Sequence, residues 1–304
     1  MIVVKTIPVT DGNLVSSSIP EPDTARGEVE WVAGTYSVGA QVIKSSTHRV
    51  YECVNDPSTT DDPEVGVLAN PQTWIDIGAT NRWKMFDNVV GYQSEGENLV
   101  VKVTNQPVIN SVSGFNISGT GTIDVKVHDT GGALVYDKTV QMIDESNVNN
   151  WWDYFFEPVI AQTRFILSDL PFYPNSTITV EGDGPEVRFG ELLFGRGVEI
   201  GETQYGTGWQ GLDFSVKERD SFGNYNVIKG RTADLLDYDI KVDKTKFGFV
   251  KSTLKSLTGV PTVWIGNPDD INDGTAVFGY YRDAQINFSS PSLIDLTVQV
   301  EGLV

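Results

Sequence analysis

The chain has 304 residues, of which 39% are hydrophobic and 21% charged, a composition typical of globular proteins and not of disordered ones. Its formal net charge is −19, with acidic side chains in every part of the sequence. Because phosphate binding needs clustered Lys and Arg, we expect no nucleic-acid partner and no membrane insertion.

The length exceeds what one hydrophobic core comfortably serves, so we predict several domains. The predicted fold class is mainly β and multi-domain: a small three-stranded module, a jelly roll or β-sandwich, and an antiparallel α+β domain. The middle part is the most acidic, with 16 acidic and 6 basic side chains over residues 85–200. The predicted segments are an N-terminal strand and extended arm (1–29), the small module (30–84), the sandwich (85–200) and the C-terminal domain (201–304).

The single cysteine, Cys53, excludes an intramolecular disulfide and a zinc knuckle. It lies in the alternating stretch VYECV, which predicts a buried strand residue. Lys5 and Pro8 interrupt the apolar N-terminus, so we expect no signal peptide, and no apolar run approaches the ~20 residues of a membrane span. These features predict a protein made in the cytoplasm and kept there unless a particle carries it out.

The N-terminal part begins with a predicted strand, MIVVKTIPV. Thr10 to Arg26 is rich in Ser, Pro and Asp and predicts an extended arm that lies on a neighbouring surface, its own or a partner's. Residues 30–77 contain short alternating runs and a long polar loop, DPSTTDDPEVGVLANP, before the last strand WIDIG. The core of so small a unit must depend on its aromatic residues, Trp31, Tyr36, Tyr51 and Trp74.

Alternation then continues over a hundred residues, with turn signals every 8–12 residues, as in a sandwich or jelly roll. Gly131-Gly132 predicts a hairpin turn. The cluster NNWWDYFFEPV either closes the open end of the sandwich as core or forms an exposed sugar platform, and we favour the core interpretation. The seven predicted strands are LVVKVT, VINSVSGFNIS, GTIDVKVHDT, ALVYDKTVQMI, RFILSDL, TITVEG and EVRFGELLFG.

The C-terminal part contains a predicted hairpin, WQGLDFSVKERDSFGNYNVIKGRT, with its turn at Asp220 to Asn224. Four apolar residues at helical spacing follow and predict one amphipathic helix, with Gly259 as its C-terminal cap. Three strands then complete an antiparallel α+β domain. The apolar face of the helix consists of Phe247, Val250, Leu254 and Leu257.

Catalytic motifs are absent from the sequence, which contains neither HExxH nor GxSxG. The two histidines, His48 and His128, are interpreted as exposed strand residues. Gly206 to Gly211 reads GTGWQG, but a strand and not a helix follows it, so a loop is favoured over a dinucleotide site. We therefore expect no enzyme, no cofactor and no metal, including calcium at Asp269 to Gly274, where Ile271 replaces an oxygen ligand. Local acid pairs such as Asp61-Asp62, Asp144-Glu145 and Asp269-Asp270 are attributed to the abundance of acids.

Asn81 to Asp87, NRWKMFD, connects the small module to the sandwich. Apolar residues on a short linker bury only by packing on both sides, so Trp83, Met85 and Phe86 predict a stiff, extended seam. Arg82 and Lys84 are expected to pair with nearby acids, each pair stabilising by only ~0–1 kcal/mol.

A pattern of aromatic and glycine residues in the small module resembles the chitin-binding-like modules of carbohydrate-binding type 5/12. The resemblance implies a three-stranded sheet and makes Tyr36 and Trp74 candidates for glycan binding. Trp151, Trp152 and Tyr154 are further candidates if the aromatic cluster is an exposed sugar platform. The stretch after Tyr51, where that family carries its sugar-stacking aromatics, here reads Cys-Val-Asn-Asp. The residues that carry the resemblance are Trp31, Gly34, Tyr36, Gly39, Val42, Tyr51, Pro71 and Trp74.

The order of arm, small module, NRWKMFD and jelly roll resembles bacteriophage tail and baseplate proteins, as does the C-terminal stretch with VWIGN and VFGYYRDAQI. The resemblance implies a structural virion subunit that forms symmetric oligomers, contacts other tail proteins and uses the arm to grip neighbours, with the C-terminal domain as anchor. Host-surface contact is a further role left open. The alternative is a carbohydrate-binding adhesin, and a polysaccharide-degrading enzyme is a third hypothesis.

Overall fold

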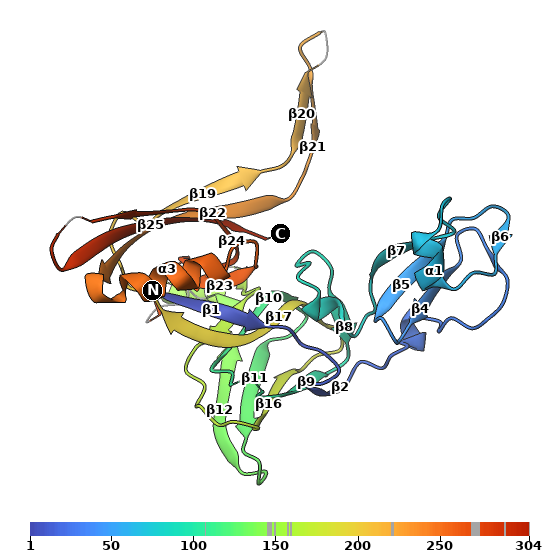
Figure 1. The fold of residues 1–304 in the computed structure, drawn as a ribbon, viewed down its shortest axis with the longest axis horizontal. Helices are drawn as coiled ribbons and strands as arrows, with labels where there is room; N and C mark the ends of the chain where they lie inside the picture. Colours follow the sequence, from blue (N-terminus) through green and yellow to red (C-terminus); the bar gives the residue numbers. More distant parts are fainter. Residues whose placement is uncertain are drawn as a thin grey trace.

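The computed structural model describes residues 1–106, 108–144, 148, 150–156, 158, 160–219, 222–268, 274–288 and 290–303. Strands make up 49% of it and helices 11%, in several sheets, which confirms the predicted mainly-β, multi-domain fold class. Figure 1 shows a central body from which the small module and one long hairpin project in different directions.

The small module is built on a three-stranded antiparallel sheet, as predicted. The long polar loop is not irregular throughout, because it contains helix α1 (Pro63–Leu68). The side chain of Asp62 accepts the N–H of Glu64 and Pro63 opens the helix, two start signals that the sequence displays. The strands are β4 (Gln41–Lys44), β5 (Arg49–Cys53) and β7 (Trp74–Ala79), with β3 (Tyr36–Ser37) paired to β6 (Ser58–Thr59).

The middle of the chain forms an eight-stranded jelly roll, and all seven strands predicted there are present. The order β8-β17-β10-β15 in one sheet faces β9-β16-β11-β12 in the other, which is the arrangement of a double Greek key. The predicted turn at Gly131-Gly132 joins β11 to β12. The strands are β8 (Ser94–Gly96), β9 (Leu99–Thr104), β10 (Ser111–Ser118), β11 (Thr122–His128), β12 (Leu134–Gln141), β15 (Phe165–Leu167), β16 (Thr177–Gly182) and β17 (Val187–Glu199). Between β12 and β15 lie the short pair β13 (Ile143–Asp144) and β14 (Ile160–Ala161) and helix α2 (Trp151–Phe156).

The first strand, β1 (Ile2–Ile7), joins the jelly roll to the C-terminal domain. It pairs antiparallel with β17 on one side and with β23 (Thr262–Ile265) on the other. One 11-stranded sheet therefore runs through both parts, and Figure 1 shows β1 lying between them. The predicted division after residue 200 lies beside this shared sheet and not at a loose linker.

The N-terminal arm lies on this chain's own jelly roll. Its strand β2 (Leu14–Ser17) pairs with β9, and Ile19 is 1% exposed in the jelly-roll core. A 3₁₀ turn, η1 (Thr24–Arg26), follows. These contacts are with the chain's own surface, one of the two that the sequence left open for the arm. Much of the arm stays exposed, Val15 at 54% for example, and the expected grip on neighbours stays a prediction.

The C-terminal sheet curls into a half-barrel around helix α3 (Phe247–Ser256). Val250, Leu254 and Leu257 are buried against Trp264 and neighbouring strand residues, which confirms the predicted amphipathic helix. Gly259 has φ +72°, the left-handed conformation expected of a C-terminal cap. The elements are β18 (Glu202–Thr203), β19 (Gly208–Asp213), β22 (Thr232–Asp243), η3 (Lys244–Lys246), β24 (Ala276–Asn287) and β25 (Leu293–Gly302).

The hairpin predicted in the C-terminal part is confirmed, with strands β20 (Val216–Arg219) and β21 (Tyr225–Ile228). Two residues of its predicted turn, Asp220 and Ser221, lie outside the described residues. It continues the β19–β22 ladder and then bends away from the body, as Figure 1 shows. We refer to residues 214–231 as the projecting hairpin.

Candidate functional site

The aromatic residues proposed as a sugar platform on the small module form its core. Trp74 is 0% exposed and its indole N–H donates to the carbonyl of Asp61 at 3.0 Å. The ring of Tyr36 meets Trp74 edge-on at 5.4 Å, and its hydroxyl donates to the carbonyl of Val32. A fully buried ring cannot stack on a sugar, so the assignment of Trp74 to glycan binding is wrong, and Tyr36 is held as its packing partner.

The aromatic cluster of α2 shows the opposite behaviour. Trp151 is 78% exposed and Trp152 68%, and the other aromatic rings of this helix are exposed too. The rings contact mainly one another, for example Trp152 against Phe156 at 4.2 Å. The favoured core interpretation of this cluster is therefore wrong. The exposed aromatic residues are Trp151, Trp152, Tyr154, Phe155 and Phe156.

The seam between the small module and the jelly roll is organised by Glu21, a residue of the N-terminal arm that no sequence pattern singles out. Its side chain is 4% exposed and accepts the indole N–H of Trp83 at 2.9 Å and the hydroxyl of Thr80 at 2.6 Å. Arg82 lies 3.8 Å from the same carboxylate, which confirms the expected pairing of that cation. A buried carboxylate with several donors stabilises only if all remain in place, so this cluster fixes the seam.

Trp83 and Met85 face opposite sides of the seam. Trp83 is 7% exposed and stacks on His48 of the small module at 4.0 Å. Met85 is 0% exposed and belongs to the jelly-roll core, against which Phe86 is half-buried. The segment is not extended as predicted, because η2 (Lys84–Phe86) is a 3₁₀ turn. This turn, rather than an extended strand, lets neighbouring side chains reach both sides.

A second buried carboxyl lies beside the seam. Glu191 of β17 is 1% exposed and one of its oxygens has no hydrogen-bond partner. Burial, together with the nearby charge of Asp87, raises the pKa of Glu191 to about 9, although the backbone N–H of Asn88 opposes the shift. Burial also raises the pKa of Asp87. Glu191 is therefore protonated at neutral pH, and it lies close to the chain that leaves the seam.

His48 is not the exposed strand residue that the sequence predicted. It lies in a turn, with Nδ1 3.1 Å from Glu21 and Nε2 3.0 Å from Asp11. Both ring nitrogens face carboxylates, so neither is placed to take a proton from a nucleophile. Within the part of the chain that the structure describes, no group of three or more His, Cys, Asp and Glu side chains could hold a metal. The loop Asp269 to Asp273 and Glu145 of the pair Asp144-Glu145 lie outside the described residues.

The GTGWQG stretch is not a dinucleotide site in this fold. Gly206 has φ +120°, and β19 begins at Gly208, so a strand starts inside the motif where a phosphate site would need a helix. Cys53 is buried and unpaired, as its alternating context predicted.

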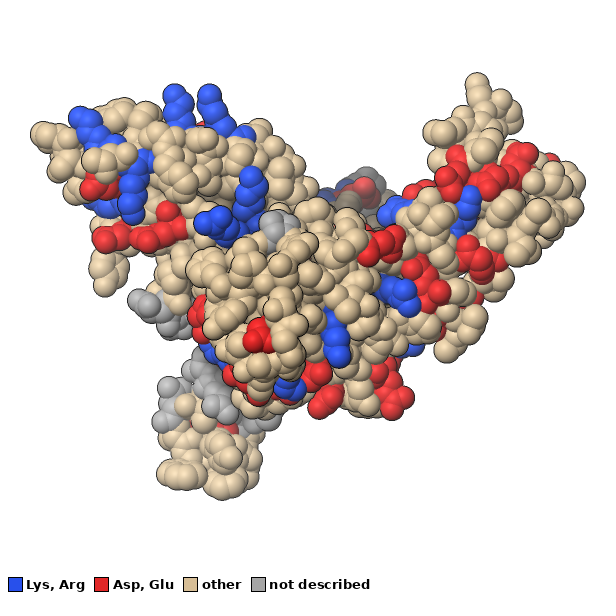
Figure 2. All heavy atoms as spheres, turned by 60° about the horizontal axis from the view of Figure 1, so that its bottom comes forward, with Lys and Arg blue, Asp and Glu red and all other residues tan. Residues whose placement is uncertain are grey.

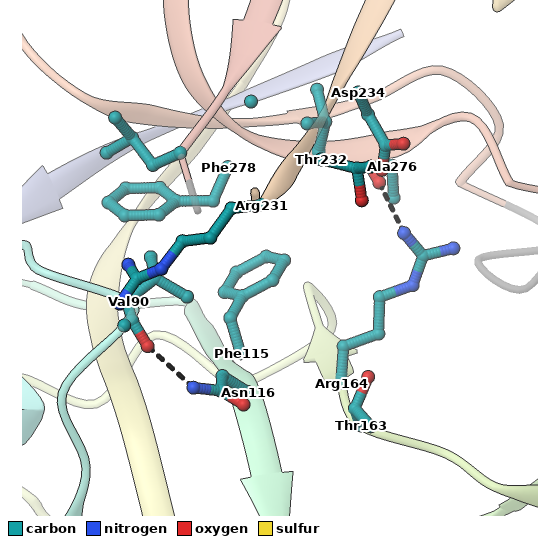
Figure 3. Close-up of a pocket in the computed structure, with 14 residues that line it drawn as sticks. Val90, Phe115, Asn116, Thr163, Arg164, Arg231, Thr232, Asp234, Ala276 and Phe278 are labelled. Carbon is teal, nitrogen blue, oxygen red and sulfur yellow. Dashed lines mark hydrogen bonds between the residues drawn. The ribbon is translucent and has the colours of Figure 1, made fainter. Parts of the chain in front are cut away.

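A cavity of about 570 Å³ lies between the jelly roll and the C-terminal sheet. Figure 3 shows Arg231 and Arg164 with their guanidinium groups at opposite ends of it. Arg164 donates to the carbonyl of Ala276 at 2.7 Å, and Arg231 lies so close to Gly91 that a Cβ there would collide with the guanidinium. Two cations that point apart do not converge on one anion, so this arrangement joins two domains and anchors the base of the projecting hairpin.

The projecting hairpin itself buries almost nothing. All eight residues of β20 and β21 are exposed, including Tyr225 at 66% and Ile228 at 61%. Strand register places Val216 and Ile228 on one face and Val227 and Tyr225 on the other, with Arg219 lying 4.7 Å over the ring of Tyr225. Both faces therefore combine apolar and charged side chains, a mixture that the sequence displays but that strand prediction alone does not interpret.

Charge is unevenly distributed over the surface. Figure 2 shows Lys and Arg gathered at the end of the molecule away from the small module, whereas Asp and Glu predominate over that module. The projecting hairpin has four basic and two acidic side chains in a chain of net charge −19. The hairpin is thus a basic, apolar element on an acidic protein.

No protein-family model, no curated protein and no solved structure matches this chain. In the described residues, no helix has both the length and the apolar character required to cross a membrane.

Proposed function

We propose that this chain is a structural subunit of a bacteriophage tail, in the baseplate, tail tip or an appendage, that acts by assembling with itself and with other virion proteins. The observation that carries the proposal is the exposed apolar surface of the projecting hairpin and of helix α2. Large exposed apolar patches on folded proteins mark sites of interaction. Among the described residues, the projecting hairpin and α2 together expose eleven large apolar side chains: Phe214, Val216, Phe222, Tyr225, Val227, Ile228, Trp151, Trp152, Tyr154, Phe155 and Phe156.

The architecture supports a structural role. β1 makes the jelly roll and the C-terminal half-barrel share one sheet, and the Glu21 cluster fixes the small module on the jelly roll. Such a body holds its projections in fixed directions, as a scaffold subunit requires. The tail location rests on the sequence resemblance to tail and baseplate proteins, and it implies synthesis in the host cytoplasm followed by incorporation into the virion.

Immunogold labelling of purified phage particles with antibodies to this chain tests the proposal. We expect label at the tail end or along the tail flank. Disrupted particles, which expose buried subunits, are labelled in parallel. The absence of label from both intact and disrupted particles would contradict a tail location.

A second candidate function, an adhesin for a host-surface glycan, is favoured by the exposed rings of α2. Exposed aromatic side chains offer flat apolar faces to sugar rings. Quenching of tryptophan fluorescence by a glycan, lost in Trp151→Ala with Trp152→Ala but kept in Trp209→Ala, would support it. Trp209 is 65% exposed on β19 and serves as the matched control. Quenching that is the same in both variants would exclude α2 as the glycan site.

A further inference from the structure

We propose that the projecting hairpin adds to the open edge of the jelly roll in a second copy of this chain, at strand β12. This inference deepens the proposed function and rests on its assembly part. It names the partner, a second copy, and the type of contact, edge-to-edge strand pairing between two different surfaces of the subunit.

The projecting hairpin lacks support within its own chain, as far as the described residues show. β20 and β21 pair only with each other among the described residues, so both outer edges keep free N–H and C=O groups. An isolated two-stranded hairpin is at best marginally stable in water. Residues such as Val227 and Ile228, at 57% and 61% exposure, gain burial only from a partner.

The position of the hairpin on the subunit directs it toward another copy. Its base is held where Arg231 packs on Gly91 and the N–H of Phe214 donates to the carbonyl of Arg231 at 3.0 Å. From there it leads away from the body, on the side opposite β12 in Figure 1. The hairpin therefore cannot fold back onto its own β12, whereas the same edge of another copy is accessible.

Charge complementarity favours the same contact. The hairpin is basic, with Lys217, Arg219, Lys229 and Arg231 against two acids. β12 has one acid and one base of its own, and two further acids, Asp124 and Asp169, lie against its side chains. Opposite potentials steer encounter and disfavour wrong partners. Two basic hairpins repel each other, so pairing between the hairpins of two copies is weaker than pairing of a hairpin with β12.

Strand length selects β12 as the acceptor edge. β12 has eight residues and pairs with β11 on one side only, within the described part of the chain, while the edges β8 and β15 have only three each. The remaining edge, β2, has four residues, as β20 and β21 do, but a register shift between Leu14 and Ser16 interrupts its ladder. An eight-residue edge accommodates the whole of β20 or β21, and such strand addition is a common mode of recognition. Because hairpin and acceptor are different surfaces, the contact is head-to-tail and builds a ring or a helical stack.

Sedimentation velocity of the purified full chain over a wide concentration range tests self-association. We expect oligomers that weaken with salt, and Val227→Asp with Ile228→Asp should weaken association at least about tenfold without changing the melting temperature. The matched control is Val65→Asp with Leu68→Asp on α1, at positions 65% and 86% exposed, which should associate as the unaltered chain does. A monomer at every concentration, or equal association of the hairpin variant, would overturn the inference.

Disulfide cross-linking identifies the acceptor. Tyr225→Cys in one preparation is mixed with Asp137→Cys in another, in the Cys53→Ser background so that the introduced thiols are the only ones. We expect a cross-linked pair to form at least about tenfold faster than Tyr225→Cys with Leu68→Cys. Preferred cross-linking of Tyr225→Cys to itself would overturn the assignment to β12. Tail label together with a monomeric chain would reject this inference and leave the tail location standing. Association through the hairpin without tail label would reject the tail location and leave this inference standing.

Discussion

The seam and the projecting hairpin contain similar residues, but these residues are largely buried in the seam and exposed in the hairpin. NRWKMFD and VKER with YNVI both combine aromatic or aliphatic side chains with two cations. In the seam, the buried carboxylate of Glu21 meets the Trp83 indole and Arg82, and the apolar rings are buried. In the hairpin, no described side chain of the body buries Tyr225 or Val227. The difference shows that an apolar and cationic stretch becomes a joint or a surface according to what the rest of the chain brings to it.

Removing the Trp83 side chain should have the largest effect on stability. Trp83→Ala deletes a 93% buried ring that stacks on His48, and we expect a loss of about 3–5 kcal/mol in the free energy of unfolding. Limited proteolysis should show faster cutting between residues 78 and 90. Trp151→Ala, at a 78% exposed position, is the control and should leave cutting there unchanged. Equal proteolysis of the two variants would remove the seam interpretation.

Neutralising Glu21 should have the next largest effect. Glu21→Gln leaves Arg82 without its carboxylate and replaces an acceptor of several donors with an amide, so we expect a loss of about 2–4 kcal/mol in the free energy of unfolding. Urea unfolding monitored by tryptophan fluorescence measures it. Glu97→Gln, at an exposed position, should change the unfolding midpoint little. If the urea midpoint of Glu21→Gln were as close to that of the unaltered chain as the midpoint of Glu97→Gln is, Glu21 would not hold the seam together.

Titration of Glu191, beside the seam, should make the free energy of unfolding depend on pH. Its pKa in the folded chain, about 9, lies above its ordinary value of 4.5, so between these values the folded state holds more protons than the unfolded chain. The free energy of unfolding should therefore fall as pH rises through this window, by at most about 1.4 kcal/mol per pH unit. Thermal melts of Glu191→Gln should show a weaker decline, with Glu97→Gln as control. Parallel pH profiles of all three proteins would show that Glu191 does not titrate in this way.

Truncation on the hairpin should have the smallest effect on the single subunit. Tyr225→Ala removes an exposed ring, and surface substitutions of this kind change stability by less than ~0.5 kcal/mol. Thermal melts at low concentration measure this. A loss as large as that of Trp83→Ala would mean that the hairpin packs against its own body.

Local patterns predicted much of the fold. Period-two alternation located the jelly-roll strands, and helical spacing with Gly259 located α3. Pairing over long sequence distances left no such pattern: β1 lies between β17 and β23 because of partners about 190 and 260 residues away. Helix α1 is not predicted from the sequence, although Asp62 is a typical N-cap residue and Pro63 a typical first residue of a helix. The polar residues around it favoured a loop.

Burial of individual side chains was predicted less well than the strands. Trp74 and the rings of α2 are all aromatic residues near polar ones, yet the first is in a core and the others are exposed. The distinction depends on whether another element covers the ring, and only the three-dimensional arrangement supplies that. Glu21 was missed because an acidic residue in a polar arm gives no local sign that Trp83, Thr80 and Arg82 will converge on it.

Hydrogen exchange measured on the purified chain over a range of concentrations reports on the seam and on the projecting hairpin in one experiment. We expect backbone amides of residues 79–87 to be protected at every concentration. Protection of β20 and β21 should be weak in dilute samples and should rise together with that of β12 as copies associate. Hairpin protection that is independent of concentration would contradict the claim that this element is completed by a second copy.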